Sequence, residues 1–504
     1  MINPLFETLF KKHENSEKIF ISLCGGNSLT YGKYMKMVYE FSAIFKSIGL
    51  KPGDRVALKI EKSQYFLAIY GACVHRGLIF LPINDNATSK ELLFFLKDSD
   101  SRLLISTKEQ VFSLKKNLNS SDLFLETLET DGTGSFRALA KGTNLSIKPE
   151  FRTLQDIVAL LYTSGTTGRP KAAMITHENL ISNSQTLVKF WRFSSEDILI
   201  HALPIYHTHG LFVATNIILL ASAKMFLLRK FDVDTVIKLF PKATTFMGVP
   251  TYYSRLLESP KLKKKLTQNM RLIVSGSAPL AKDMSDEFFY RTGKRILERY
   301  GMTETNMISS NPYFGERRAG TVGYPLPGIE IRICNPENGN SLSFGEVGEI
   351  ELKGKNVFKG YWRMLKETEE NFRHDGFFRT GDLGKFDQQG FLEIVGRLKD
   401  LIITGGLNVY PKEVENILDS FSGVKESAVI GLPHYDFGEV VLAVIISENG
   451  KNLDKKQLDY YLKGNLAKYK CPKAYIFLNS LPRNNLGKVL KSSLRDNYKK
   501  FFLI

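Results

Sequence analysis

Cysteine, histidine and tryptophan are scarce in this chain of 504 residues, which contains 4, 8 and 2 of them respectively. The four cysteines, Cys24, Cys73, Cys334 and Cys471, lie far apart and form no CxxC pair. This spacing excludes a disulfide framework and a cysteine-based zinc cluster. We expect free thiols in a reducing compartment.

Long hydrophobic runs are also absent. The longest apolar stretch, Leu211 to Leu228, is interrupted by Thr215, Asn216, Ser222 and Lys224, so it predicts a buried helix followed by a strand rather than a membrane span. The N-terminal segment has no hydrophobic region of sufficient length and no cleavage site for a signal peptide. We therefore expect a cytoplasmic protein that does not insert into membranes.

Negative charge is in deficit, because 69 Lys and Arg residues face 52 Asp and Glu residues and give a net charge of +17. The lysines are dispersed, and the one compact run, Lys263 to Lys265, is typical of a solvated helix end. The chain contains no aromatic-basic motif of an RNA- or DNA-binding module, so we expect no nucleic-acid partner. The positive charge instead suits anionic small molecules.

The Walker A loop of P-loop ATPases, GxxxxGK[ST], is missing. The nearest candidate has only two residues between Gly165 and Gly168, and Pro170 precedes Lys171. A different phosphate loop is indicated instead by the segment YTSGTTGRPK, which lies between the apolar runs 157–161 and 172–175. Its glycines let the backbone approach an anion, its Ser and Thr hydroxyls add donors, and its lysine adds a mobile charge. The alternative for this segment alone is a flexible surface hairpin.

The alternation of strand-like and helix-like segments predicts a parallel, doubly wound α/β sheet from about residue 54 to residue 310. The expected strands are Val56 to Ile60, Leu78 to Pro82, Leu103 to Ser106, Ile198 to Leu203, Lys224 to Leu228, Thr244 to Met247 and Leu272 to Ser275. From Gly320 to Val395 the chain consists of short runs broken by Gly, Pro and Asn, which predicts an all-β segment. A domain boundary is expected near residues 396–400. Beyond it we expect a compact α+β module with helices at 411–421 and 455–466 and strands at 426–432 and 440–447.

Four further sites fit nucleotide chemistry. In Tyr300-Gly301-Met302-Thr303-Glu304 the ring could stack on adenine and the carboxylate could hold Mg²⁺. Asp382 could accept hydrogen bonds from ribose hydroxyls, and Arg397 and Lys488 could bind phosphate. Each residue alone has an ordinary structural alternative, as a core ring, a capping carboxylate, an ion pair or a solvated lysine.

Taken in order, the segments YTSGTTGRPK, YGMTE, TGD, GRLKD and PRNNLGK resemble the motifs of the acyl-adenylate-forming (AMP-binding) enzymes, which include acyl-CoA synthetases, peptide-synthetase adenylation domains and beetle luciferases. The resemblance covers nearly the whole chain. It implies an N-terminal domain at residues 1–398, built of doubly wound α/β subdomains and a β-rich subdomain. It also implies a smaller, mobile α+β domain at residues 399–504.

The resemblance further implies that ATP, Mg²⁺ and CoA are bound by residues from both domains. The ATP-binding residues would be Thr163, Ser164, Gly165, Thr166, Thr167, Gly168 and Lys171 at the phosphates, Gly276, Ser277, Ala278, Tyr300, Gly301 and Thr303 around the adenine, and Asp382, Arg397 and Lys488 at the ribose and α-phosphate. Glu304 would hold the metal, Lys399 would be the hinge, and Gly405 and Gly406 would line the tunnel for the pantetheine of CoA. Lys488, Arg397 and His207 would be catalytic, His207 as a gate between acyl pocket and tunnel.

The nature of the acid depends on Arg299, which precedes Tyr300. A buried guanidinium needs an anionic partner, which is either Glu298 or another structural carboxylate, or a second carboxylate on the substrate held bidentately. The segments ERYGMTETNMISSNPYFGERRAGTVGYPLPG, NVFKGYWRM, GGLNVYPKEVE and LPRNNLGKV are similar to the malonyl-CoA synthetase branch of the family. This resemblance implies that malonate, and also methylmalonate, is joined to CoA. The residues around the acid would be Arg299, His207, Ser277 and Met302.

Other functions stay open at this point. The chain could activate another short-chain acid, or it could be a stand-alone adenylation enzyme that passes its acyl group to a carrier protein. A peptide-synthetase pocket would have an Asp where this chain has Leu211 to Ala214. A zinc site at His207 and His209 lacks a third ligand of suitable spacing. A non-enzymatic nucleotide sensor would not need every polar residue of the site. Either a monomer or a homodimer is compatible with the sequence.

Overall fold

The computed structural model describes residues 2–23, 26–115, 123–140, 147–163, 170–448, 453–484 and 487–502. The chain divides into two compact units. Unit 1 comprises Met1–Glu330 and Lys353–Gly376, and unit 2 comprises Ile331–Leu352 and Phe377–Ile504. This division follows packing. The domain boundary expected between residues 398 and 399 stays a prediction.

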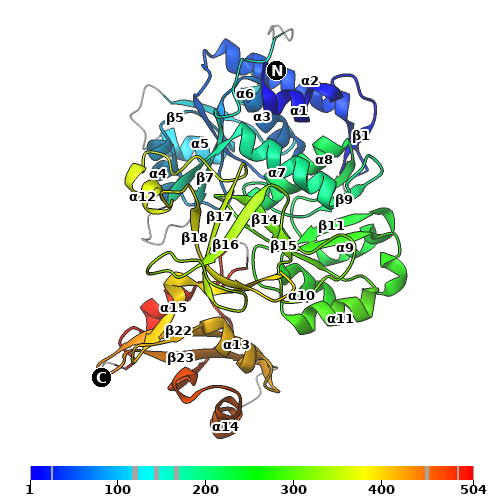
Figure 1. Ribbon diagram of the computed structural model, residues 1–504. Helices are drawn as coiled ribbons and strands as arrows, with labels where there is room; N and C mark the ends of the chain where they lie inside the picture. Colours follow the sequence, from blue (N-terminus) through cyan, green and yellow to red (C-terminus); the bar gives the residue numbers. More distant parts are fainter. Residues whose placement is uncertain are drawn as a thin grey trace. The chain divides into compact units, whose positions relative to one another are not determined.

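Two large sheets organise unit 1 (Figure 1). In spatial order, the first contains β15 (Tyr324–Pro325), β14 (Asn306–Ser310), β13 (Leu297–Met302), β12 (Leu272–Ser275), β11 (Thr245–Gly248), β9 (Ile198–His201), β10 (Lys224–Leu227), β1 (Ile19–Leu23) and β2 (Ser28–Thr30). The second contains β6 (Phe124–Thr127), β5 (Ser101–Ser106), β3 (Arg55–Lys59), β4 (Ile79–Pro82), β7 (Ile157–Thr163) and β8 (Lys171–Thr176). The central strands of both sheets pair in parallel, whereas β2, β14, β15 and β8 join antiparallel at the edges.

Helices α3 (Gln64–His75), α4 (Ser89–Ser99), α10 (Pro250–Glu258) and α11 (Lys282–Thr292) each connect two parallel strands of one sheet, as the crossovers of an α/β fold require. The other helices of unit 1 are α1 (Pro4–Leu9), α2 (Tyr31–Ser47), α5 (Lys108–Lys115), α6 (Ser135–Ala138), α7 (His177–Phe190), α8 (Asn216–Ala221), α9 (Val233–Leu239) and α12 (Leu365–Glu370). Helix α7 packs against α1 and α8 (Figure 1). It starts directly after β8, where the Thr176 hydroxyl accepts from the backbone N–H of Asn179 and so caps the helix.

Unit 2 contains a smaller antiparallel sheet and the C-terminal α+β module. The sheet has the order β16 (Ile329–Cys334), β17 (Gly348–Gly354), β18 (Phe378–Phe386) and β19 (Leu392–Arg397). The module has a sheet of β21 (Leu407–Val409), β20 (Ile402–Thr404), β23 (Gly438–Ser447) and β22 (Val424–His434), with β24 (Ala474–Phe477) beside β23, and helices α13 (Pro411–Asp419), α14 (Lys455–Asn465) and α15 (Lys491–Tyr498).

Both faces of the β22–β23 pair are apolar, which explains why the sequence of β23 reads as an almost continuous hydrophobic run. Val441, Ala443 and Ile445 face a core shared with residues of α13 and α14. The alternate residues, Leu442 and Val444, face a second core that includes Leu494 of α15. Because successive side chains of β23 point to opposite faces, one face of the sheet packs against α13 and α14 and the other against α15.

The predicted fold class, an α/β protein with a smaller α+β C-terminal module, is confirmed. The expectation of an all-β segment between Gly320 and Val395 is wrong in part, because α12 lies within it and residues 353–376 pack with unit 1. Cys73, Cys334 and Cys471 are buried free thiols, and Cys24 lies outside the described residues.

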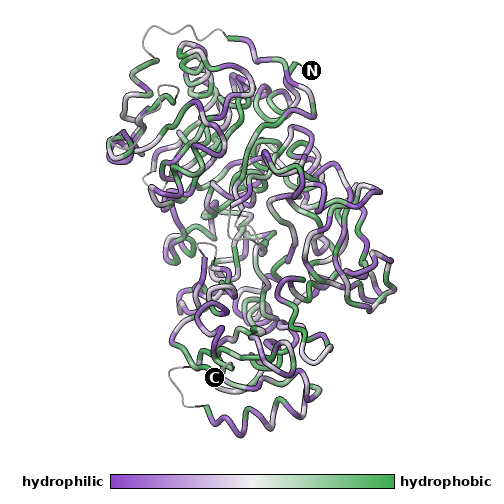
Figure 2. The backbone as a smooth tube through the Cα atoms, turned by 90° about the vertical axis from the view of Figure 1, so that its left-hand side faces the viewer, coloured by the Kyte–Doolittle hydropathy of each residue, from purple (hydrophilic) through white to green (hydrophobic). Residues whose placement is uncertain are grey.

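None of the helices in the described ranges is both long enough and apolar enough to cross a membrane. Figure 2 shows hydrophilic and hydrophobic residues interspersed along the chain in each unit.

Candidate functional site

The predicted phosphate loop connects the antiparallel strands β7 and β8, as the strand–loop–strand pattern indicated. Thr163 and Lys171 are directly opposite in the ladder, and the Thr163 hydroxyl donates to the Lys171 carbonyl at 3.4 Å. The two ends of the loop are therefore held together at the edge of the second sheet. The predicted phosphate ligands Ser164, Gly165, Thr166, Thr167 and Gly168 lie outside the described residues.

The predicted adenine-binding segments lie on neighbouring strands of the first sheet. Gly276, Ser277 and Ala278 follow the end of β12, and β13, which carries Tyr300 to Met302, pairs beside β12 in parallel. Ser277 has a left-handed backbone conformation with φ +72°, which is uncommon for a residue other than glycine and is frequent at functional sites. The register of β13 against β14 shifts between Tyr300 and Gly301, forming a bulge that re-aims the side chains at this point.

Arg299, on β13, is buried with 3% of its surface exposed, and its Nε and Nη2 atoms have no hydrogen-bond partner among the described residues. The guanidinium lies against Gly276, where any side chain would overlap with it. Burial lowers the pKa of Arg299 to about 9, so the group still carries its charge at neutral pH. The neighbouring Glu298 does not serve as its partner, because a carboxylate oxygen of Glu298 accepts from the backbone N–H of Gly320 at 2.9 Å.

His207 lies just before the π-helical segment η2 (His209–Thr215), and His209 is the first residue of that segment. His207 is half-buried, and its backbone carbonyl accepts from the N–H of Leu211 at 2.9 Å. Burial lowers the pKa of His207 to about 4, which keeps its ring neutral near pH 7. Both ring nitrogens of His209 are buried without a hydrogen-bond partner among the described residues. Burial lowers the pKa of His209 well below its usual value, and the positive charge of Arg299 lowers it further.

Glu304, the candidate metal ligand, is buried in the turn between β13 and β14. Its Oε1 atom accepts from the hydroxyl of Tyr361 at 3.0 Å. No three His, Cys, Asp or Glu side chains gather as a metal site in the described ranges. A single carboxylate fits Mg²⁺, which keeps several waters and takes other ligands from substrate phosphates.

Unit 2 brings together the remaining candidates for nucleotide binding. Asp382 on β18 and Arg397 on β19 are directly opposite in register, and Arg397 Nε lies 2.6 Å from Asp382 Oδ1. Asp382 is 3% exposed, so the arginine compensates a buried negative charge. The two residues were predicted from separate motifs, and the sequence did not indicate that they pair.

Lys488 lies within electrostatic reach of this ion pair in the same unit. Its backbone N–H donates to the Asn484 side chain at 3.0 Å, which closes the loop around it. Lys488 is exposed to solvent, yet desolvation by the surrounding protein and then the charge of Arg397 lower its pKa to about 8. Asp382 opposes this shift, and Lys399 and Asp400 act on Lys488 as well.

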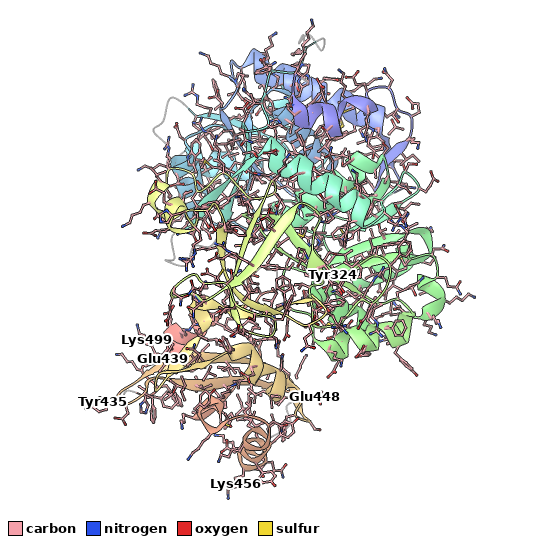
Figure 3. The ribbon with its side chains drawn as sticks, viewed as in Figure 1. Tyr324, Tyr435, Glu439, Glu448, Lys456 and Lys499 are labelled. Atoms are coloured by element: carbon pink, nitrogen blue, oxygen red, sulfur yellow. The ribbon has the colours of Figure 1, made fainter. Side chains whose placement is uncertain are left out.

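Gly405 and Gly406 form the two-residue turn between β20 and β21, with φ +56° and +78°. Such left-handed conformations at both positions favour glycine and suit a tight hairpin. The Gly405 N–H donates to the Phe437 carbonyl at 2.8 Å, which ties this turn to the end of the β22–β23 hairpin. At that end Tyr435 projects away from the sheet (Figure 3) and is 95% exposed. Lys399 lies in the short helix η5 (Leu398–Asp400).

The candidate residues thus form two groups, one in each unit. Tyr361 was missed as a functional candidate, although the segment NVFKGYWRM that contains it was noted for its resemblance. His209 was considered only as a zinc ligand. The pairing of Gly276 with Arg299 was missed as well, and neighbouring parallel strands are what bring these two residues together.

Comparison with known proteins gives the family. The AMP-binding enzyme family matches residues 7–362, and its C-terminal domain matches residues 413–488. A malonate–CoA ligase of Arabidopsis thaliana is 32% identical over 98% of this chain and 88% of its own length. A feruloyl-CoA synthase of Amycolatopsis is 33% identical over 94% of this chain and 95% of its own length. The crystal structure of ATP-bound MatB from Rhodopseudomonas palustris is 48% identical, with a TM-score of 0.97 and full coverage of both chains. The chain belongs to the AMP-binding enzyme family.

Proposed function

We propose that this chain is a malonate–CoA ligase, which forms malonyl-CoA, AMP and pyrophosphate from malonate, ATP and CoA and also accepts methylmalonate. The enzyme is an AMP-forming acid–thiol ligase, as its CoA ligase relatives are. Those relatives do not by themselves identify the acid, because one named for malonate and one named for ferulate are similarly identical to the chain.

The observation that carries the choice of acid is the buried guanidinium of Arg299, whose Nε and Nη2 atoms have no hydrogen-bond partner among the described residues. A buried charge without a partner costs several kcal/mol, about 3–5 where a partner has been removed. A substrate with a second carboxylate would compensate this charge, and a monocarboxylic acid with an apolar tail would leave it unpaired. Neutral His209 lies within electrostatic reach of Arg299, and its two ring nitrogens have no hydrogen-bond partner among the described residues. We therefore assign Arg299 to the distal carboxylate of malonate, with His207, Ser277 and Met302 around the rest of the acid.

In the first half-reaction, a carboxylate oxygen of malonate attacks the α-phosphorus of ATP. The bond from that phosphorus to the bridging oxygen breaks, and pyrophosphate leaves. Lys488 and Arg397 would stabilise the negative charge that builds up at the α-phosphate, and Lys171 and the phosphate loop would hold the departing group. Asp382 would bind the ribose hydroxyls, and Tyr300 with residues 276–278 would hold the adenine. Glu304 would bind Mg²⁺, which neutralises phosphate charge when bound.

In the second half-reaction, the CoA thiolate attacks the acyl carbon, the carbon–oxygen bond to phosphate breaks, and AMP leaves. Gly405 and Gly406 would allow the thin pantetheine chain to pass, because glycine leaves room beside the backbone. His207 would separate the acyl pocket from this path. The domain formed by residues 399–504 would turn about Lys399 between the two steps. We further propose that the enzyme is cytoplasmic and is either a monomer or a homodimer.

Steady-state kinetics of Arg299→Ala with malonate and with butyrate test the assignment. We expect kcat/KM for malonate to fall about a hundredfold or more, mainly through KM, because loss of a buried charge partner costs about 2–5 kcal/mol. Butyrate should be used by the variant at least as well as by the wild type. Equal losses with both acids would contradict the pairing of Arg299 with the second carboxylate. Absence of acid-dependent pyrophosphate release in the wild type would contradict the ligase activity with these acids.

A further inference from the structure

We propose that Tyr361 is a positioning residue that connects the lysine of the phosphate loop, Lys171, to the metal carboxylate, Glu304. The inference rests on the proposed function, which assigns Lys171 to phosphate and Glu304 to Mg²⁺. Tyr361 acts through these two residues.

The hydroxyl of Tyr361 makes the first connection. It donates to Glu304 Oε1 at 3.0 Å, and both side chains are buried, with 8% and 6% of their surface exposed. A hydrogen bond of this kind restricts the rotation of the Glu304 carboxylate. Outer partners of metal ligands commonly act in this way, and their loss lowers metal affinity by about 10–100-fold.

The ring of Tyr361 makes the second connection. Lys171 Nζ lies over it at 5.4 Å from the ring centroid, within the range of a cation–π contact. Lys171 is the first residue of β8, directly after the phosphate loop. Its long side chain has many rotamers, and the contact with the aromatic face restricts them.

The backbone around Tyr361 holds this arrangement in place. Tyr361 forms an antiparallel bridge with Ala173 of β8, and the adjacent Trp362 N–H donates to the Ala172 carbonyl at 2.8 Å. On the other side, the Phe358 N–H donates to the Glu304 carbonyl at 2.7 Å. The segment 358–362 is therefore bonded both to the strand that leaves the phosphate loop and to the residue that would hold the metal.

The N-terminal side of the same segment is also fixed. Asn179 of α7 donates to the carbonyls of Lys355 and Val357 at 2.8 and 2.7 Å, and Asn356 donates to the Thr305 carbonyl at 2.7 Å. These bonds join β8, α7 and the β13–β14 turn through one strap of chain. Tyr361 is the residue of this strap whose side chain contacts both candidate ligands. Its removal should therefore affect the metal and the phosphates more than the acid.

Titration of Mg²⁺ into the full-length enzyme with α,β-methylene-ATP, followed by calorimetry, tests the inference without turnover. Tyr361→Phe removes the hydroxyl and keeps the ring, so we expect the apparent Mg²⁺ affinity to fall about tenfold. Binding of the analogue at saturating Mg²⁺ should stay near the wild-type value. Tyr361→Leu removes both contacts and should weaken analogue binding at saturating Mg²⁺ as well. In steady-state assays, KM for malonate should not change in Tyr361→Phe.

The matched control is Tyr39→Phe, because the Tyr39 hydroxyl also donates to a carboxylate, Glu14 Oε1, at 2.6 Å on a distant helix. This control should leave the Mg²⁺ titration unchanged. A double-mutant cycle with Glu304→Gln should show that Tyr361→Phe has no further effect once the carboxylate is lost. An unchanged Mg²⁺ titration in Tyr361→Phe, or additive effects in the cycle, would overturn the inference while leaving the proposed function intact. Failure of the wild type to bind the analogue in a Mg²⁺-dependent way would instead overturn the proposed function.

Discussion

Glu298 and Arg299 are adjacent residues of β13, yet their buried ionisable groups have different surroundings. Successive side chains of a strand point to opposite faces. Arg299 therefore lies against Gly276, whereas Glu298 accepts one backbone hydrogen bond from Gly320. The carboxyl group is 7% exposed, and burial raises its pKa to about 8, although the Gly320 N–H partly opposes the shift. Burial shifts the pKa of both residues, upward for Glu298 and downward for Arg299.

Glu298 predicts a measurable dependence of stability on pH. The ordinary pKa of a glutamate, which applies in the unfolded chain, is 4.5, and the pKa of Glu298 in the folded protein is about 8. Between these two pH values the folded state keeps a proton that the unfolded chain releases. The free energy of unfolding should therefore fall as pH rises from about 4.5 to about 8. Glu298→Gln, which keeps an acceptor for Gly320, should remove part of this fall and stabilise the protein at pH 8 by about 1–3 kcal/mol. Denaturant unfolding of the wild type and of Glu298→Gln at pH 5 and pH 8 measures this difference. Glu337→Gln, at an exposed position, is the control. A parallel pH trend in Glu298→Gln and wild type would contradict the prediction.

At the level of single residues, sequence motifs identify candidates but not their partners. The loop hydroxyls, Tyr300, Glu304 and Lys488 are candidates because each lies in a short segment whose composition indicates nucleotide chemistry, and their roles stay predictions. The Asp382–Arg397 pair depends on the register of β18 against β19. The contacts of Tyr361 depend on a bridge to a strand that lies almost two hundred residues earlier in the chain. Such long-range registers are set by packing of the whole sheet, which no local pattern encodes.

Between elements, a buried lysine links the two sheets of unit 1. Lys62, which follows β3 of the second sheet, donates to the carbonyls of His201 and Leu203 at 2.8 and 2.7 Å and to His201 Nδ1 at 2.9 Å. His201 ends β9 of the first sheet, and its other ring nitrogen donates to the carbonyl of Gly210 in η2 at 2.9 Å. Burial lowers the pKa of Lys62 well below its usual value. The network thus fixes the chain on both sides of His207 and His209.

Lys62→Met should destabilise the protein by about 3 kcal/mol. Methionine fills a similar volume, but it leaves two buried carbonyl groups and a ring nitrogen without a donor, at a cost of about 1–3 kcal/mol for each group that water does not reach. Lys12→Met is the control, because exposed Lys12 also donates to a backbone carbonyl, that of Leu220. Urea unfolding with both variants measures the difference. A loss below about 1 kcal/mol in Lys62→Met would mean that the network contributes little.

Apolar elements bounded by turn residues were predictable from the sequence, and short polar elements were not. The runs that became β3, β4, β5, β9, β10 and β12 are apolar and bounded by turn residues, which is sufficient to predict buried parallel strands. Helix α12 has the sequence LKETEE and no buried residue, so it carries no hydrophobic pattern by which to recognise it. It was therefore absorbed into the segment expected to be all-β.

For the whole molecule, the proposed reaction requires residues of both units. Lys488, Asp382 and Arg397 belong to unit 2, and the phosphate loop, Arg299 and Glu304 belong to unit 1. The two half-reactions differ in chemistry, because the first expels pyrophosphate from phosphorus and the second attacks carbon with a thiolate. In the proposed mechanism, Lys488 acts only in the first of these, and Gly405 and Gly406 act only in the second. The two steps should therefore respond separately to substitutions in unit 2.

The pH dependence of the two half-reactions should diverge because of Lys488. In the proposed mechanism Lys488 stabilises the transition state through its positive charge, which it carries only when protonated. Its pKa is about 8, so pyrophosphate release should slow as pH rises above about 8. Formation of malonyl-CoA from preformed malonyl-adenylate should instead rise over the same range, because more of the CoA thiol is ionised.

Lys488→Ala separates the two steps. It should lower pyrophosphate release by about a hundredfold or more, as loss of a group that stabilises transition-state charge does, and leave the second half-reaction near the wild-type rate. Lys499→Ala, at an exposed lysine after α15 in the same unit (Figure 3), is the control and should change neither step. Single-turnover assays of each half-reaction between pH 6.5 and pH 9.5, a range of about 1.5 pH units on either side of the Lys488 pKa, measure both effects. Equal loss of both steps in Lys488→Ala would show that the lysine does not act in adenylation alone.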